Sequence, residues 1–202
     1  LGLLSSRKAN AISKAAKDVW QSKHNDEFPL DVFQTGSGTS SNMNANEVIA
    51  NLATKFSGIS IDPNDDVNMS QSSNDVIPTA IKVSAFLDIS NKLYPALDKL
   101  ISTIEVKANS IKGSVKTGRT HLMDAMPIDF SQELNAWSSQ LKNSRDTLSF
   151  LEKRLLDLPQ GGTAVGTGIN AHARFSKVFA KELSKLVGKV LKQNQAMIFF
   201  KN

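Results

Sequence analysis

Three segments of the chain concentrate small hydrogen-bonding side chains. They are residues 35–42, residues 70–75 and the run Gly-Arg-Thr-His at residues 118–121. Hydroxyl and amide side chains beside the free N–H groups of a helix N-terminus form a natural pocket for a carboxylate or a phosphate. The pattern therefore indicates anion binding, and His121 adds an imidazole that can transfer a proton.

Each segment also has a structural interpretation. Ser, Thr and Asn are the ordinary residues of helix caps and turns. A single histidine after a loop is often only a hydrogen-bonded structural side chain. Arg119 could pair with Asp124 or Glu133 and brace its loop. Residue types alone leave both interpretations open.

The segments lie between stretches with helical periodicity. Apolar residues recur in steps of three and four within residues 6–22, 48–56, 76–111, 134–155 and 175–190. Ser5 or Ser6 is the expected cap of the first helix, and Pro95 predicts a kink or a restart near Leu93. The alternating pattern of strands is missing throughout. The sequence predicts an all-α fold of long, nearly antiparallel helices packed as a bundle.

The expected organisation is an N-terminal helical domain, residues 1–72, and a central helical-bundle domain, residues 73–202, both partial. Asp62-Pro63-Asn64-Asp65 is the strongest turn signal. Helices with apolar stripes on more than one side need further helices or subunits to cover them, so we expect an oligomer. The opening residues lack Met and a signal peptide, so we expect a longer parent protein. The tail Lys189–Asn202 matches no pattern.

Bulk composition excludes several classes of function. No apolar run approaches the roughly 20 residues that cross a bilayer. There is no cysteine, and the three histidines are far apart, so no metal site is expected. The net charge of +5 comes from dispersed Lys and Arg, which argues against nucleic acid and is compatible with a small dianion.

Four blocks together resemble the fumarase/aspartase superfamily, and the resemblance runs through most of the chain. The blocks are residues 33–48 (FQTGSGTSSNMNANEV), 64–80 (with NDDVN, QSSND and PTA), 118–133 (with GRTHLMDA and QE) and 161–170 (GGTAVGTGIN).

Within that superfamily, class II fumarases resemble this chain in carrying His after Gly-Arg-Thr, where aspartases usually carry Gln. The resemblance therefore implies fumarate hydratase activity, the reversible hydration of fumarate to L-malate through an aci-carboxylate intermediate. It implies no metal and no cofactor, a place in the tricarboxylic acid cycle, and a cytoplasmic or mitochondrial location. The alternatives are aspartate ammonia-lyase and a catalytically dead helical remnant. Argininosuccinate and adenylosuccinate lyases lack the Gly-Ser-Gly-Thr block.

The resemblance also implies roles for residues. Thr120 and His121 would be catalytic, His121 as the acid and base at the hydroxyl. The groups that would bind the substrate carboxylates are Ser37, Thr39, Ser72, Ser73 and Asn74. A secondary dicarboxylate site would lie at Asp62, Asn64 and Asp65, weakened because Asp62 stands where bacterial members often have His.

One family feature is missing from the sequence. The loop Gly-Ser-Ser-x-Met-Pro-x-Lys-x-Asn, which carries the proton-abstracting serine, does not occur. We therefore expect the 202-residue chain alone to be inactive, and the full-length form to be a homotetramer whose sites combine several subunits.

Overall fold

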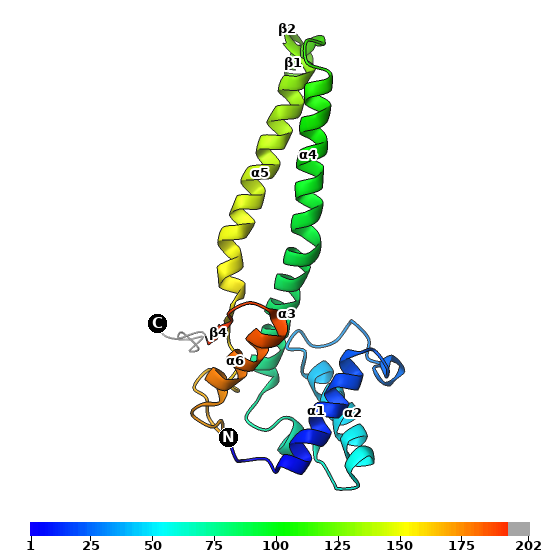
Figure 1. Cartoon of the computed structure of the whole chain (residues 1–202), viewed down its shortest axis with the longest axis vertical. Coiled ribbons are helices and arrows are strands. Elements are labelled where there is room, and N and C mark those ends of the chain that lie inside the picture. The colour runs from blue at the N-terminus through cyan, green and yellow to red at the C-terminus, as the bar shows by residue number, and fades with distance from the viewer. Residues whose placement is uncertain (194–202) are drawn as a thin grey trace. The chain divides into compact units, whose positions relative to one another are not determined.

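The computed structural model describes residues 1–193, and the chain forms two compact units. Unit 1 contains residues 1–82 together with the segment that starts at Asp157, and unit 2 contains Val83–Leu156. The helices are α1 (Ser6–Trp20), α2 (Thr39–Ser57), α3 (Ser73–Asp88), α4 (Tyr94–Ser110), α5 (Phe130–Leu155) and α6 (Phe175–Val187) (Figure 1). The strands are β1 (Val115–Thr120), β2 (Met123–Asp129), β3 (Asp157–Leu158) and β4 (Lys192–Gln193). The domain boundary expected at residue 72 stays a prediction.

Unit 1 has a core of small side chains between α1 and α2. Ala11 and Ala15 of α1 pack with Ala50 and Ala53 of α2, and Ile61 closes the cluster. Alanine lets two helices approach closely, so the pair buries apolar surface without long side chains. The predicted cap of α1 is confirmed at Ser5, whose hydroxyl accepts a hydrogen bond from the Lys8 amide.

The helix restart predicted near Leu93 is confirmed. A π turn at Ile89–Leu93 separates α3 from α4. Pro95 stands in the first turn of α4, where its missing N–H and fixed φ are tolerated. The shift of helical register therefore lies just before the proline.

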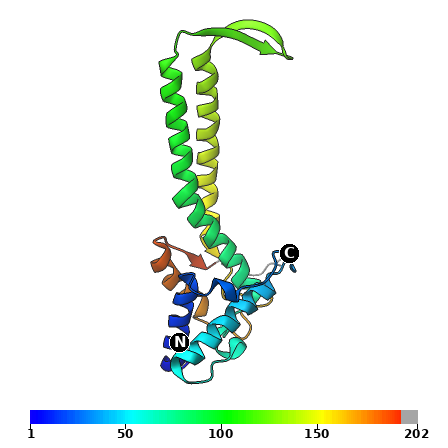
Figure 2. The ribbon, with the colours of Figure 1, turned by 90° about the vertical axis from the view of Figure 1, so that its right-hand side faces the viewer.

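Unit 2 is built on the antiparallel pair α4 and α5, which lie side by side in Figures 1 and 2. Charged and polar side chains connect the two helices along their length. The connections are Asp98 with Arg145, Glu105 with Lys142 and Ser138, and Tyr94 with Glu152. Helix α5 begins with a capping box. The Asp129 carboxylate accepts a hydrogen bond from the Gln132 backbone N–H, and the Gln132 side chain accepts one from the Asp129 backbone N–H.

The expectation that strands are absent was wrong. β1 and β2 form an antiparallel hairpin with Val115 opposite Asp129 and Thr120 opposite Met123, and β3 pairs in parallel with β4. The hairpin turn is His121-Leu122, with φ of 50° and 64°. Such turns usually contain Asn-Gly or Asp-Gly, and Pro127 argues against a strand, so the usual sequence signals were missing. Helices still dominate, which confirms the helical class.

Two further structural findings concern residues 1–193. No helix among them combines the length and apolar character that a membrane span needs. Within the same residues, no group of three or more His, Cys, Asp or Glu side chains is placed to hold a metal ion.

Candidate functional site

Four hydroxyl groups form a continuous chain in unit 1. Thr35 Oγ1 lies 3.1 Å from Ser37 Oγ, Ser37 Oγ lies 3.1 Å from Thr39 Oγ1, and Thr39 Oγ1 lies 3.0 Å from Ser73 Oγ. Thr39 begins α2 and Ser73 begins α3. The hydroxyl chain therefore joins two helix N-termini, whose partial positive charges favour an anion.

The second predicted segment is ordered by its own side chains. Ser72 Oγ accepts a hydrogen bond from the backbone N–H of Asn74 at 3.2 Å. Asp75 Oδ1 accepts one from the backbone N–H of Ser72 at 2.9 Å. These two bonds cap the start of α3, in a variant of the capping box in which the Ser72 hydroxyl accepts from the second residue of the helix and not from the third. The side chain of Asn74 donates from Nδ2 to the carbonyl oxygen of Ala164 at 2.8 Å.

The sequence did not predict that residues 159–166 would lie next to Ser37, Ser73 and Asn74. Pro159 and residues 162–166 line one side of a pocket of about 430 Å³, whose other side includes Ser37, Ser73 and Asn74. A second pocket of about 300 Å³ is lined by Thr39, Ser72 and Ser73 among others. Ser73, Thr163 and Ala164 line both pockets.

The five predicted carboxylate-binding residues thus gather in unit 1. The Gly-Gly-Thr run at residues 161–163 resembles the family but carries no predicted site role. Asp75 was also missed as a site residue, although its position three residues after Ser72 is a capping-box signal.

Thr120 and His121 belong to unit 2, and the structure gives their surroundings within that unit. Both side chains are exposed, Thr120 at the end of β1 and His121 in the hairpin turn. Arg119 Nε lies 3.4 Å from Asp124 Oδ1, so of the two possible partners it pairs with Asp124. The other, Glu133, is bound instead by Lys116 at 2.6 Å.

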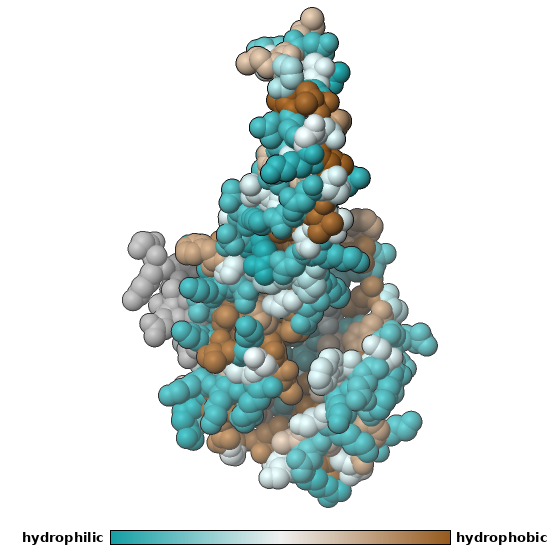
Figure 3. Space-filling view, turned by 45° about the horizontal axis from the view of Figure 1, so that its top comes forward, coloured by the Kyte–Doolittle hydropathy of each residue, from teal (hydrophilic) through white to brown (hydrophobic). Residues whose placement is uncertain are grey.

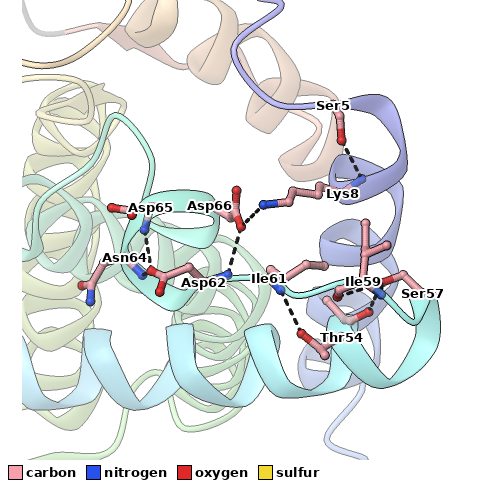
Figure 4. A network of polar contacts seen from close by, with 11 residues as sticks. Ser5, Lys8, Thr54, Ser57, Ile59, Ile61, Asp62, Asn64, Asp65 and Asp66 are labelled. Carbon is pink, nitrogen blue, oxygen red and sulfur yellow. Dashed lines mark hydrogen bonds and ion pairs between the residues drawn. The ribbon is translucent and has the colours of Figure 1, made fainter.

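The residues predicted to form a secondary site take part in the polar network of Figure 4. Asp62 Oδ1 accepts from the amides of Asn64 at 2.7 Å and Asp65 at 2.8 Å. The neighbouring Asp66 carboxylate accepts from Lys8 Nζ at 2.5 Å and from the Asp62 amide at 2.9 Å. Asp62 therefore caps the π turn Pro63–Val67, and its role in dicarboxylate binding stays a proposal.

Burial and hydrogen bonding oppose each other at Asp66. Burial alone would raise the pKa of its carboxyl group, but the hydrogen bonds from Lys8 and from the Asp62 amide outweigh it, and the pKa is lowered. The carboxylate is thus held ionised between α1 and the π turn.

Comparison with known protein families matches residues 1–198 to a family described as Lyase. The chain belongs to this lyase family. Its curated relatives include the class II fumarate hydratase of Xylella fastidiosa strain Temecula1, which is 53% identical over 188 residues, covering 93% of this chain and 40% of the relative. The class II fumarate hydratase of Bacillus subtilis is 49% identical over 193 residues, covering 93% of this chain and 42% of the relative.

Solved structures agree with the lyase assignment. A class II fumarase from Schistosoma mansoni superposes with a TM-score of 0.91 and 35% identity, covering 97% of this chain and 46% of the other. A fumarate lyase:delta crystallin from Brucella melitensis bound to cobalt gives a TM-score of 0.88 and 41% identity, covering 96% of this chain and 44% of the other. The resemblance to class II fumarases is confirmed, and the lyase chain spans about 40% of the curated relatives' length.

Proposed function

We propose that this lyase chain supplies the carboxylate-binding part of a fumarate hydratase, which interconverts fumarate and L-malate. The observation that carries the proposal is the hydroxyl chain from Thr35 to Ser73, which joins the N-termini of α2 and α3 beside a pocket of about 430 Å³. The similarity to class II fumarate hydratases supports the choice of substrate.

The proposed chemistry explains why so many donors are needed. Dehydration of malate needs a base to take a proton from the carbon next to a carboxylate, and by resemblance to the family that base is a serine on a loop that this sequence does not contain. The negative charge then moves onto the carboxylate as an aci-carboxylate. Ser37, Thr39, Ser72, Ser73 and Asn74 would donate hydrogen bonds to the carboxylate oxygens as this charge develops. His121 would donate a proton to the departing hydroxyl so that it leaves as water, and Thr120 would hold that water.

The assembly is part of the same proposal. Side chains on the α4–α5 pair are exposed although apolar, among them Val106 at 67%, Trp137 at 50% and Phe150 at 65%. Figure 3 shows such apolar surface among hydrophilic groups on this part of the chain. We propose that further copies cover it in a homotetramer. By resemblance to the family, the reaction would belong to the tricarboxylic acid cycle in the cytoplasm.

A hybrid enzyme tests the activity. The matching segment of the Bacillus subtilis class II fumarate hydratase is replaced by this chain, which is 49% identical to it. L-malate should then produce a rise in absorbance at the fumarate wavelength. A folded hybrid that instead released ammonia from aspartate would make the chain an aspartase segment.

His121→Asn in the hybrid isolates the proton transfer. Asn tolerates the left-handed conformation that His121 adopts, with φ of 50°, so the melting temperature should be retained. Loss of the imidazole should lower kcat by about 10²-fold or more. Unchanged turnover would remove His121 from the mechanism.

A further inference from the structure

Asp75 has a carboxylate that no proposed step of the reaction uses. As a whole residue, Asp75 is 2% exposed, while Asp66, also buried, is 9% exposed. A carboxylate removed from water must be compensated by hydrogen bonds or by an opposite charge. The hydrogen-bond partners of the Asp75 carboxylate therefore indicate its role.

Three backbone N–H groups satisfy the Asp75 carboxylate. Oδ1 accepts from Ser72 at 2.9 Å, and Oδ2 accepts from Gly161 at 2.9 Å and from Thr163 at 2.7 Å. Hydrogen bonds to an ionised group are stronger than those between neutral groups. One carboxylate thus joins two segments that are more than 80 residues apart in the sequence.

The segment held by Oδ2 has an unfavourable backbone. Gly161 has a φ of 96° and Thr163 a φ of 58°. The left-handed conformation is costly for a β-branched residue such as threonine, and it persists only where the surroundings enforce it. The Asp75 carboxylate accepts from both residues and so supports this conformation.

The segment held by Oδ1 carries the proposed substrate donors. It includes Ser72 and leads into Asn74. The side-chain amide of Asn74 donates from Nδ2 to the Ala164 carbonyl oxygen at 2.8 Å. That contact fixes the orientation of the Asn74 amide, which has a second N–H to offer to a carboxylate. The position of Asn74 therefore depends on where residues 161–164 lie.

We propose that Asp75 is a positioning residue that joins residues 72–74 to residues 161–164, so that both segments form a single wall for binding a substrate carboxylate. The inference rests on the proposed function of this wall. Asp75 itself does not touch substrate; it acts through Ser72, Gly161 and Thr163.

Asp75→Asn in the 202-residue chain tests the proposal. Whichever way the new amide is turned, at least one of the three backbone N–H groups meets another N–H. Amide hydrogen exchange at Ser72, Gly161 or Thr163 should accelerate by about tenfold or more. The affinity for L-malate, followed by NMR shifts at Ser73 and Asn74, should fall by about tenfold.

Asp66→Asn is the matched control, since Asp66 is also buried but contacts Lys8 and Asp62. It should leave the exchange at Gly161 and Thr163 and the malate affinity unchanged. Faster exchange in Asp75→Asn with unchanged malate affinity would reduce Asp75 to a stabilising residue and overturn the proposal. Unchanged exchange would overturn it too.

Two further outcomes are separable. If the wild-type chain binds no malate, the proposed function of the wall fails, and the exchange rates alone decide whether Asp75 joins the two segments.

If Asp75→Asn does not fold, Asp75→Glu decides, because it keeps the charge and moves the carboxylate by one methylene. Glu should weaken malate binding severalfold in a folded chain, and wild-type affinity would overturn the proposal.

Discussion

At the scale of single residues, the ion pair between Lys8 and Asp66 links α1 to the turn that follows α2. The Asp66 side chain is 10% exposed and that of Lys8 is 32% exposed. Removing Lys8 would leave a largely buried carboxylate with one hydrogen bond fewer, which costs more than removing an exposed pair.

Lys8→Met should therefore lower the free energy of unfolding by about 1–3 kcal/mol near neutral pH. The pKa of Asp66 is lowered in the folded chain from its ordinary value of 3.8. Its stabilisation is present above 3.8 and is lost as the pH falls through the folded pKa, so the difference between wild type and Lys8→Met should shrink in that acid range. Urea unfolding at several pH values measures this.

Lys23→Met is the control for that variant. Lys23 pairs with Asp18 at 2.6 Å, but its side chain is 54% exposed. Solvent screens exposed pairs, so the loss should be smaller at every pH. Equal losses for the two variants would contradict the role given to burial.

Residue types alone predicted where small hydrogen-bonding side chains are concentrated, the cap of the first helix at Ser5 or Ser6, and the turn that begins at Asp62, whereas the five carboxylate-binding residues were assigned by resemblance to the family. Capping depends on neighbours within three residues, so the sequence contains the whole signal. The role of Asp75 could be predicted only in part. Its bond to Ser72 is local, whereas Gly161 and Thr163 are brought to it by the tertiary fold.

At the scale of elements, Gly161 in the segment between β3 and α6 has no room for a side chain. A Cβ on Gly161 would lie 2.5 Å from Ser176 Cβ, and its φ is 96°. Gly188 at the end of α6 also has a positive φ, 71°, but no atom lies within 4 Å of the Cβ position. Substitutions at these two glycines therefore distinguish the cost of a steric clash from the cost of the left-handed backbone conformation.

Gly161→Ala should lower the free energy of unfolding by about 3 kcal/mol or more, since a clash adds to the cost of the left-handed conformation. Gly188→Ala carries the conformational cost alone, about 1 kcal/mol. Thermal or urea unfolding of both variants measures the difference. Similar losses would show that the contact with Ser176 relaxes freely.

The helices were predictable because their periodicity repeats over several turns, and the restart before Pro95 followed from the chemistry of proline. The β1–β2 hairpin was not predictable, since its turn places His121 and Leu122 at positive φ without Asn or Gly. The contacts of the neighbouring strands stabilise a turn that the two residues do not favour by themselves.

At the scale of the whole molecule, the exposed apolar side chains of α4 and α5 predict self-association. Trp137→Asp should shift the chain toward smaller species in sedimentation, because a charge would enter the proposed subunit contact. Trp20→Asp on α1 is the matched control, since Trp20 is 75% exposed and Trp137 is 50% exposed. Dissociation by both variants, or by neither, would contradict the proposed α4–α5 contact.

Unit 1 consists of two separate stretches of the chain, and this determines the order in which its parts are synthesised. Its first part ends at Lys82 and its second begins at Asp157, so the whole of unit 2 is synthesised between them. The α4–α5 hairpin has contacts that are local in sequence and can fold as soon as it leaves the ribosome. Residues 161–163 emerge later, and until then the Asp75 carboxylate lacks two of its three N–H partners. The wall that we propose to bind a carboxylate can therefore be completed only after the whole α4–α5 hairpin has been synthesised.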